Sequence, residues 1–187
     1  MAMLHDPSRK YRPFPQVPLP DRQWPGRTIA QPPRWLSTDL RDGNQAIVDP
    51  MDAVKKNRFF DLLVEIGVKE IEIGFPSAGQ TEFDFISGLG RSGKIADDVI
   101  VQVLTQSRED LIRTSFDSLA GAGKAIVHLY NAVSPAWREI VFRMTPGEVR
   151  EVAVKGAKVM RDEAGKRPEA DWHFQYSPET FSTAELD

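Results

Sequence analysis

The chain has 187 residues, of which 41% are hydrophobic and 27% charged, an ordinary globular composition whose default interpretation is one domain. Its formal net charge of −3 gives no bulk attraction to nucleic acid or to an anionic membrane, so we expect neither as a partner. The absence of cysteine excludes disulfides and thiolate metal sites. No apolar run approaches the roughly 20 residues of a membrane span, and residues 1–10 lack the apolar core of a signal peptide. We expect a soluble, cytoplasmic protein.

Residues 1–33 form a proline-rich arm that holds eight of the 14 prolines of the chain. Each proline fixes φ and removes an amide donor, which predicts an extended arm or a wrap over the surface of the domain at 34–187. The aromatic side chains of Tyr11, Phe14 and Trp24 could anchor such an arm. A partly ordered lead-in is the simpler alternative.

From residue 34 onward, short apolar runs alternate with stretches of helical periodicity. We expect the first helix to be capped by Asp49 before Pro50 and to end at Gly67. A further turn or helix start is expected at Ser177-Pro178-Glu179. The predicted strands are 35–40, 70–75, 98–104, 125–130 and 172–176, and the predicted helices are 49–67, 80–89, 108–120 and 145–163.

Five strand-helix repeats without hairpin signals imply parallel strands joined by right-handed crossovers. This leaves an open doubly wound sheet or an α/β TIM barrel of the (β/α)8 type. No GxGxxG or Walker loop follows a strand, whereas polar residues follow every strand, and both observations favour the barrel. A complete barrel needs about 250 residues. We therefore expect an incomplete barrel, from the N-terminal portion of a longer protein, a truncated gene product or a piece that needs a complement.

Three segments then carry a family resemblance. They are LRDGNQAIVDPMDAVKKNRFFDLLVEIGVKEIEIGFPSAGQTEFDF, IVHLYNAVSPAWREIVF and FQYSPETFS. Together they resemble the 2-isopropylmalate synthases with a proline-rich N-terminal extension, within the wider group of pyruvate-carboxyltransferase-like barrels. The LRDGxQ signature alone is shared by homocitrate synthases, citramalate synthases and hydroxymethylglutaryl lyases, so these remain alternatives. A non-catalytic remnant or interaction module that pairs its open sheet edge with another chain is a third.

The resemblance implies an acyltransferase that condenses acetyl-CoA with 2-oxoisovalerate to give 2-isopropylmalate and CoA, the first committed step of leucine biosynthesis. It implies a homodimer when full length. It also implies a divalent metal, Mg, Mn or Zn, held by the signature aspartate and by an HxH pair. That pair is absent, because His5, His128 and His173 are the only histidines. We therefore expect the isolated chain to be inactive and to bind metal weakly.

The signature loop contributes three candidate site residues. Asp42 offers the hard carboxylate oxygen that a divalent metal prefers, although an aspartate before Gly43 also suits a simple turn. With the resemblance, Asp42 is the expected metal ligand. Arg41 would polarise the ketone and stabilise the developing alkoxide, or else form a surface salt bridge. Gln45 would bind substrate through its amide, or serve only as a helix-entry residue.

His128 lies within an apolar run, where a satisfied core histidine is the common outcome. Strand alternation, however, places His128 and Tyr130 on one face and Val127 and Leu129 on the other. If the apolar pair packs against helices, His128 points into the barrel mouth. The resemblance implies that it contacts substrate there.

The fifth predicted strand is followed by two further candidates. The resemblance implies that Ser177 and Glu179 contact the oxo acid, with the Glu179 carboxylate near the reacting centre; a helix-capping turn is the alternative. Glu72, in the second strand, could be an inward carboxylate that supports Arg41, since buried charges need partners. We interpret His173 as structural.

Overall fold

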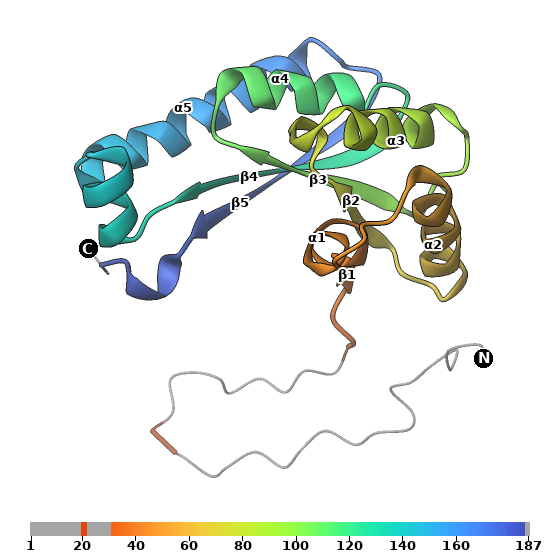
Figure 1. The fold of residues 1–187 in the computed structure, drawn as a ribbon, viewed down its shortest axis with the longest axis horizontal. Coiled ribbons are helices and arrows are strands. Elements are labelled where there is room, and N and C mark those ends of the chain that lie inside the picture. Colours follow the sequence, from red (N-terminus) through yellow and green to blue (C-terminus); the bar gives the residue numbers. More distant parts are fainter. Residues whose placement is uncertain (1–19, 22–30, 186–187) are drawn as a thin grey trace.

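The computed structural model describes residues 20–21 and 31–185. Most of the predicted arm at 1–33 therefore lies outside the described residues. The described chain contains a five-stranded, wholly parallel sheet in the order β1-β2-β3-β4-β5 (Figure 1). The strands are β1 Leu36–Ser37, β2 Glu70–Gly74, β3 Ile100–Gln106, β4 Lys124–Ala132 and β5 Asp171–Glu179, and the helices are α1 Asn44–Ala46, α2 Ala53–Glu65, α3 Gln80–Arg91, α4 Glu109–Ser118 and α5 Pro146–Gly165. Short helical turns are η2 Asp39–Gly43, η3 Pro76–Ala78, η4 Trp137–Phe142 and η5 Phe181–Thr183.

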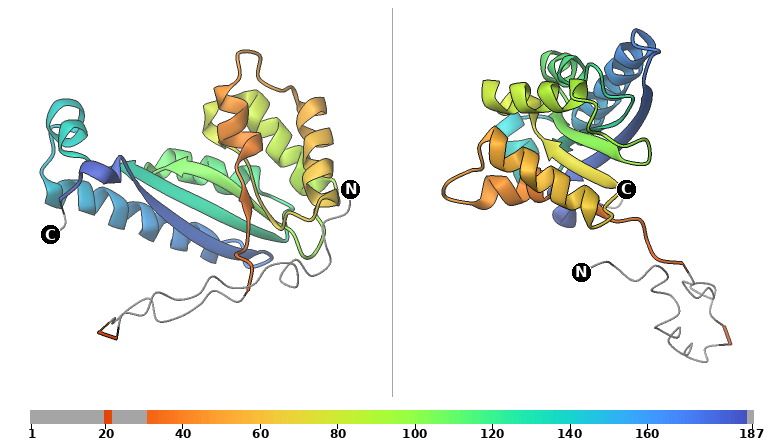
Figure 2. Two further views of the ribbon diagram at one scale, coloured as in Figure 1. Left: turned by 90° about the horizontal axis from the view of Figure 1, so that it is seen from below. Right: turned by 90° about the vertical axis from the view of Figure 1, so that its right-hand side faces the viewer.

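The strand order distinguishes the two predicted architectures. Each strand pairs with the next one in the sequence, and the order never reverses. Right-handed crossovers that always advance in one direction place every helix on the same side of the sheet. Helices α3, α4 and α5 indeed share one face (Figures 1 and 2). A doubly wound sheet would reverse its order and carry helices on both faces, so the winding is that of a barrel.

The core fills the space between the sheet and these helices. On β4, Val127 and Leu129 belong to the buried apolar cluster, as the predicted alternation requires. Phe116 of α4 is fully buried in the same cluster, and its ring centroid lies 4.8 Å from that of Trp172. Burying one such side chain stabilises the fold by about 1.5–3 kcal/mol. None of the helices in the described part of the chain is long and apolar enough to cross a bilayer.

Two predicted boundaries in the first unit are wrong. The strand at 35–40 is only two residues long, because the Thr38 carbonyl accepts the amides of Arg41, Asp42 and Gly43 at 3.2, 2.9 and 3.2 Å and turns the chain into η2. Helix α2 is not capped at Asp49-Pro50. The Asp52 side chain caps it instead, by accepting a 2.8 Å bond from the Lys55 amide.

The predicted turn at Ser177-Pro178-Glu179 is also wrong. These residues end β5, where they pair with Tyr130, Asn131 and Ala132 of β4. Proline is tolerated there because β5 is an edge strand of the described sheet.

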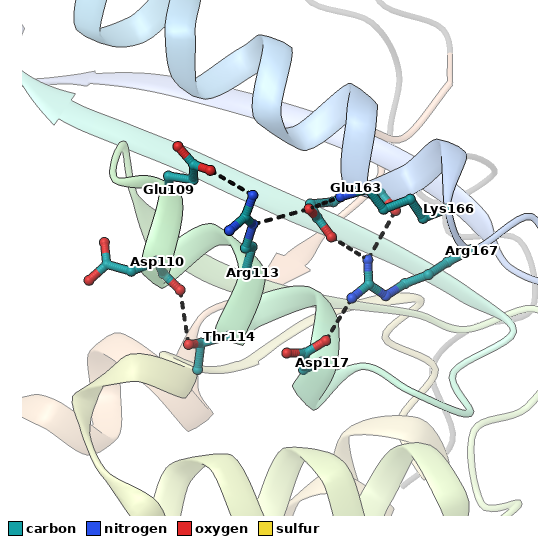
Figure 3. A network of polar contacts seen from close by, with 8 residues as sticks. All are labelled: Glu109, Asp110, Arg113, Thr114, Asp117, Glu163, Lys166 and Arg167. Atoms are coloured by element: carbon teal, nitrogen blue, oxygen red, sulfur yellow. Dashed lines mark hydrogen bonds and ion pairs between the residues drawn. The ribbon is translucent and has the colours of Figure 1, made fainter.

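An ion-pair cluster joins α4 to α5 on the outer layer (Figure 3). The buried Glu163 carboxylate accepts from Lys166 and Arg167 at 2.6 Å each and from Arg113 at 3.3 Å. Arg167 also donates to Asp117 of α4 at 2.6 Å. The cluster thus fixes the position of α5 relative to α4.

Candidate functional site

The site begins at the turn that follows β1. Three amides converge on the Thr38 carbonyl, and this tight turn brings Arg41 and Asp42 beside the second strand. The Arg41 guanidinium donates through Nε and Nη2 to Oε2 of Glu72, at 2.7 Å each, and through Nη1 to Asp42 Oδ1 at 2.7 Å. The prediction that Glu72 supports Arg41 is confirmed.

A line of hydrogen bonds continues across the next three strands. The second Glu72 oxygen, Oε1, lies 2.9 Å from Gln102 Nε2 and 3.0 Å from His128 Nδ1. The other ring nitrogen of His128, Nε2, lies 2.7 Å from the Ser177 hydroxyl. Side chains from the β1 loop and from β2, β3, β4 and β5 thus form one continuous polar row, which consists of Asp42, Arg41, Glu72, Gln102, His128 and Ser177.

The charge at the centre of the row is carried by Glu72, whose side chain is fully buried. Burial by itself would raise the pKa of this carboxyl. Hydrogen bonds from His128 and Gln102, together with the positive charge of Arg41, outweigh burial and lower the pKa below its usual value. Glu72 is therefore an anion that anchors its neighbours.

Glu179 lies at the end of β5, where its side chain is exposed. It nevertheless acts on the same region of the structure. The pKa of the Tyr130 hydroxyl is raised, first by burial and then by the negative charge of Glu179, while the Arg41 charge opposes this shift. Tyr130 therefore lies within electrostatic reach of both Glu179 and Arg41.

The comparisons with known proteins agree with this architecture. The HMGL-like family model matches residues 32–187. The chain belongs to the HMGL-like family. Its predicted α/β TIM-barrel fold, present among the described residues as five parallel strands with their connecting helices, is confirmed by this membership together with the sequential strand order.

Several relatives of this HMGL-like chain are 2-isopropylmalate synthases. It is 58% identical to the 2-isopropylmalate synthase of Pseudomonas fluorescens strain Pf-5 over 187 residues, which is all of this chain and 34% of the relative. The 2-isopropylmalate synthases of Pseudomonas savastanoi pv. phaseolicola and Pseudomonas putida strain W619 are also 58% identical, with the same coverage. The chain thus spans about a third of the length of these curated relatives.

Not every predicted residue joins the row of this HMGL-like domain. Gln45 lies in α1 with an exposed side chain, and no side-chain hydrogen bond links it to the row within residues 31–185. Its neighbour Asn44 is buried and accepts a 2.6 Å bond from the Met51 amide, so this amide braces the loop. His173 is exposed and lies 3.2 Å from Asp171, and it is not part of the row.

One member of the row was missed by the sequence reasoning. Gln102 is fully buried in β3 and contacts both Glu72 and His128. The available signal was a long amide inside the otherwise apolar run IVQVL, because a buried polar side chain needs partners.

The described residues do not complete a metal site. Asp42 is the only predicted ligand among them, its side chain is 65% exposed, and its Oδ1 accepts from Arg41. Within the described residues, no group of three or more His, Asp or Glu side chains is placed to hold a metal ion. Asp42 fits as one oxygen ligand, and this part of the chain does not supply a complete set.

Proposed function

We propose that this chain is the N-terminal part of the catalytic barrel of a 2-isopropylmalate synthase, which condenses acetyl-CoA with 2-oxoisovalerate to give 2-isopropylmalate and CoA. The observation that carries the proposal is the polar row, which places an arginine, a carboxylate and an imidazole along neighbouring strands. The 58% identity to synthases across the whole chain supports it. A cytoplasmic homodimer is part of the same proposal.

Arg41 is the proposed electrophilic residue. Its guanidinium is held by Glu72 and Asp42, so the positive charge is in place before the ketone of the oxo acid becomes an alkoxide. Such preorganised charge stabilises the transition state without reorganisation during the reaction. Glu72 therefore serves this step by holding Arg41.

Asp42 is the proposed ligand for a divalent metal, which is Mg, Mn or Zn. The other ligands of this metal ion would come from outside the described residues. When bound, such an ion would polarise the carbonyl of a chelated 2-oxo acid. Gln45, His128, Ser177 and Glu179 are the proposed substrate contacts, and Glu179 the proposed carboxylate near the reacting centre.

A chimera tests the proposal. This chain replaces the matching 34% of the Pseudomonas fluorescens relative, and CoA release is followed with a thiol reagent. We expect turnover with acetyl-CoA and 2-oxoisovalerate that exceeds turnover with pyruvate or 2-oxoglutarate. The unmodified relative is the positive control, and the Arg41→Ala chimera is the negative one.

Each other outcome contradicts the proposal in a different way. Preference for pyruvate or 2-oxoglutarate would assign the chain to a citramalate or homocitrate synthase. A chimera that folds as the relative does but releases no CoA with any of the three oxo acids would indicate a non-catalytic remnant or interaction module.

A further inference from the structure

Three polar atoms crowd together at the centre of the row. Glu72 Oε1, Gln102 Nε2 and His128 Nδ1 lie 2.9, 3.0 and 3.1 Å apart in pairs. Glu72 and Gln102 are fully buried and His128 nearly so. Water therefore cannot hydrogen-bond to a donor or acceptor that these side chains leave unpaired. The positions of the hydrogens on the three groups must match one another.

The charge of Glu72 decides this arrangement. An ionised carboxylate only accepts, so its contact with His128 is a hydrogen bond only when Nδ1 carries a proton. With Nδ1 bare, it could accept from Gln102 Nε2 at 3.1 Å, but its lone pair would then face the buried anion at 3.0 Å. With Nδ1 protonated, His128 and Gln102 both donate to the Glu72 carboxylate, and the 3.1 Å contact between the two nitrogens is not a hydrogen bond. A charge-assisted bond is about twice as strong as a neutral one. Glu72 therefore selects the Nδ1-protonated ring.

Gln102 is oriented by the same anion. With its amide reversed, the Gln102 oxygen would lie 2.9 Å from Glu72 Oε1, oxygen against oxygen. As placed, the amide donates to Glu72, while its own Oε1 is buried and has no hydrogen-bond partner in the described part of the chain. A leucine of similar size would fill this space without an unsatisfied atom, so packing alone does not account for Gln102. Its N–H is the group that the site uses.

The proton on Nδ1 also determines the hydrogen bond of the second ring nitrogen of His128, Nε2. A neutral imidazole with its proton on Nδ1 has a bare Nε2, which must accept. Ser177 lies 2.7 Å from Nε2 and is only partly buried. Its single hydrogen is thus committed to His128, and the Ser177 oxygen remains able only to accept from a ligand.

We propose that Glu72, supported by Gln102, is a positioning residue that holds His128 in its Nδ1–H form and thereby makes Ser177 an acceptor toward the bound ligand. This rests on the proposed function for the identity of that ligand. A ligand group that hydrogen-bonds to Ser177 must then be a donor, such as the product hydroxyl at the former ketone carbon, whereas the ketone of the oxo acid, which only accepts, contacts Ser177 without a hydrogen bond. The carboxylate of the oxo acid, which only accepts, must be bound by other groups.

The test is nitrogen-15 NMR of the histidine rings in the 187-residue chain at neutral pH. His5 and His173 are replaced by glutamine to assign the His128 signals. We expect a proton on Nδ1 and a bare Nε2 whose shift is moved by an incoming hydrogen bond. A proton on Nε2 in the wild type would overturn the proposal outright.

Three variants and one matched control separate positioning from mere packing. Ser177→Ala should leave the proton on Nδ1 and return the Nε2 shift to that of a nitrogen without a hydrogen bond. Glu72→Gln should move a measurable fraction of the proton to Nε2, because the neutral amide no longer selects one form. Gln102→Leu should accelerate exchange of the Nδ1 proton, and Gln106→Leu, the same change further along β3, should not.

The remaining outcomes count against the proposal. An Nε2 shift unchanged in Ser177→Ala would show that Ser177 does not donate. If the proton of the His128 ring stays on Nδ1 in Glu72→Gln, Glu72 does not select the tautomer. If the Nδ1 proton exchanges at the same rate in Gln102→Leu and Gln106→Leu, Gln102 does not support this position. The spectra require no substrate, metal or turnover, so these failures are distinct from failure of the chimera assay.

Discussion

Replacing Glu163 by glutamine removes the central charge of the α4–α5 cluster and keeps the shape of the side chain (Figure 3). Glu163 is only 4% exposed. Hydrogen bonds first from Lys166 and then from Arg167 outweigh its burial and lower its pKa from 4.5 to about 2. Because the ionised form is the stabilised one, the substitution should lower the free energy of unfolding at neutral pH.

The size of the loss follows from the pKa. A fall from 4.5 to about 2 corresponds to about 3 kcal/mol at about 1.4 kcal/mol per unit. Lys166 and Arg113 are 60% and 54% exposed, so water screens part of their interaction. We therefore expect Glu163→Gln to destabilise the chain by about 2 kcal/mol near pH 7.

The pH dependence has a definite sign. A carboxylate whose folded-state pKa is depressed stabilises fully above its unfolded pKa and loses this contribution as the pH falls toward the folded value. The two proteins should therefore converge in stability as the pH falls from about 4.5 toward about 2. Urea unfolding followed by circular dichroism at several pH values measures both curves.

A neighbouring carboxylate provides the control. Asp162 is exposed and pairs only with Arg161 among the described residues, so Asp162→Asn makes the same charge change outside the cluster. Its effect should stay within about 0.5 kcal/mol. The reasoning is refuted if Glu163→Gln costs no more than Asp162→Asn near neutral pH, or if its loss is as large in acid as at neutral pH.

Three further predictions concern packing, the arginine and the metal. Gly156→Ala should lower the free energy of unfolding in urea by about 1–3 kcal/mol, because the added Cβ would meet Ser107 Oγ at 2.2 Å. The control is Gly88→Ala, where the added Cβ meets open space, and it should be neutral or stabilise the chain by up to about 1 kcal/mol. Arg41→Lys in the chimera should lower CoA release by about 100-fold, because one ammonium does not replace a guanidinium that holds Glu72 through two nitrogens. Calorimetry should show only weak Zn²⁺ or Mn²⁺ binding by the isolated chain, and tight stoichiometric binding would contradict the incomplete ligand set.

The strand faces were predictable from the sequence because alternation is a local property. The pattern around His128 placed Val127 and Leu129 toward the helices, and the structure confirms it. The pairing of Glu72 with Arg41 also followed, from the rule that a buried charge needs a partner.

The errors arose where one backbone group or one neighbour decides the conformation. The Thr38 carbonyl accepts three amides and so ends β1 early, and the hydrophobic periodicity of the sequence does not predict this turn. Ser177 and Glu179 belong to β5 because β4 extends far enough to pair with them, which is a non-local cause. Gln102 was missed because its partners lie on two other strands.

The polar row does not run straight across the ladder, and this offset links the site to the fold. Glu72 and Gln102 are register partners, but the partner of Gln102 on β4 is Ile126, so His128 lies two residues further along. The partner of His128 on β5 is Gln175, and Ser177 again lies two residues further. Strands of a closed barrel tilt against its axis, so inward side chains at one height lie further along some strands than along their neighbours, as they do from β3 to β4 and from β4 to β5. The hydrogen bonds of the row therefore follow the offset of the strands from β3 to β5, which explains how positions so far apart in the sequence share one buried charge.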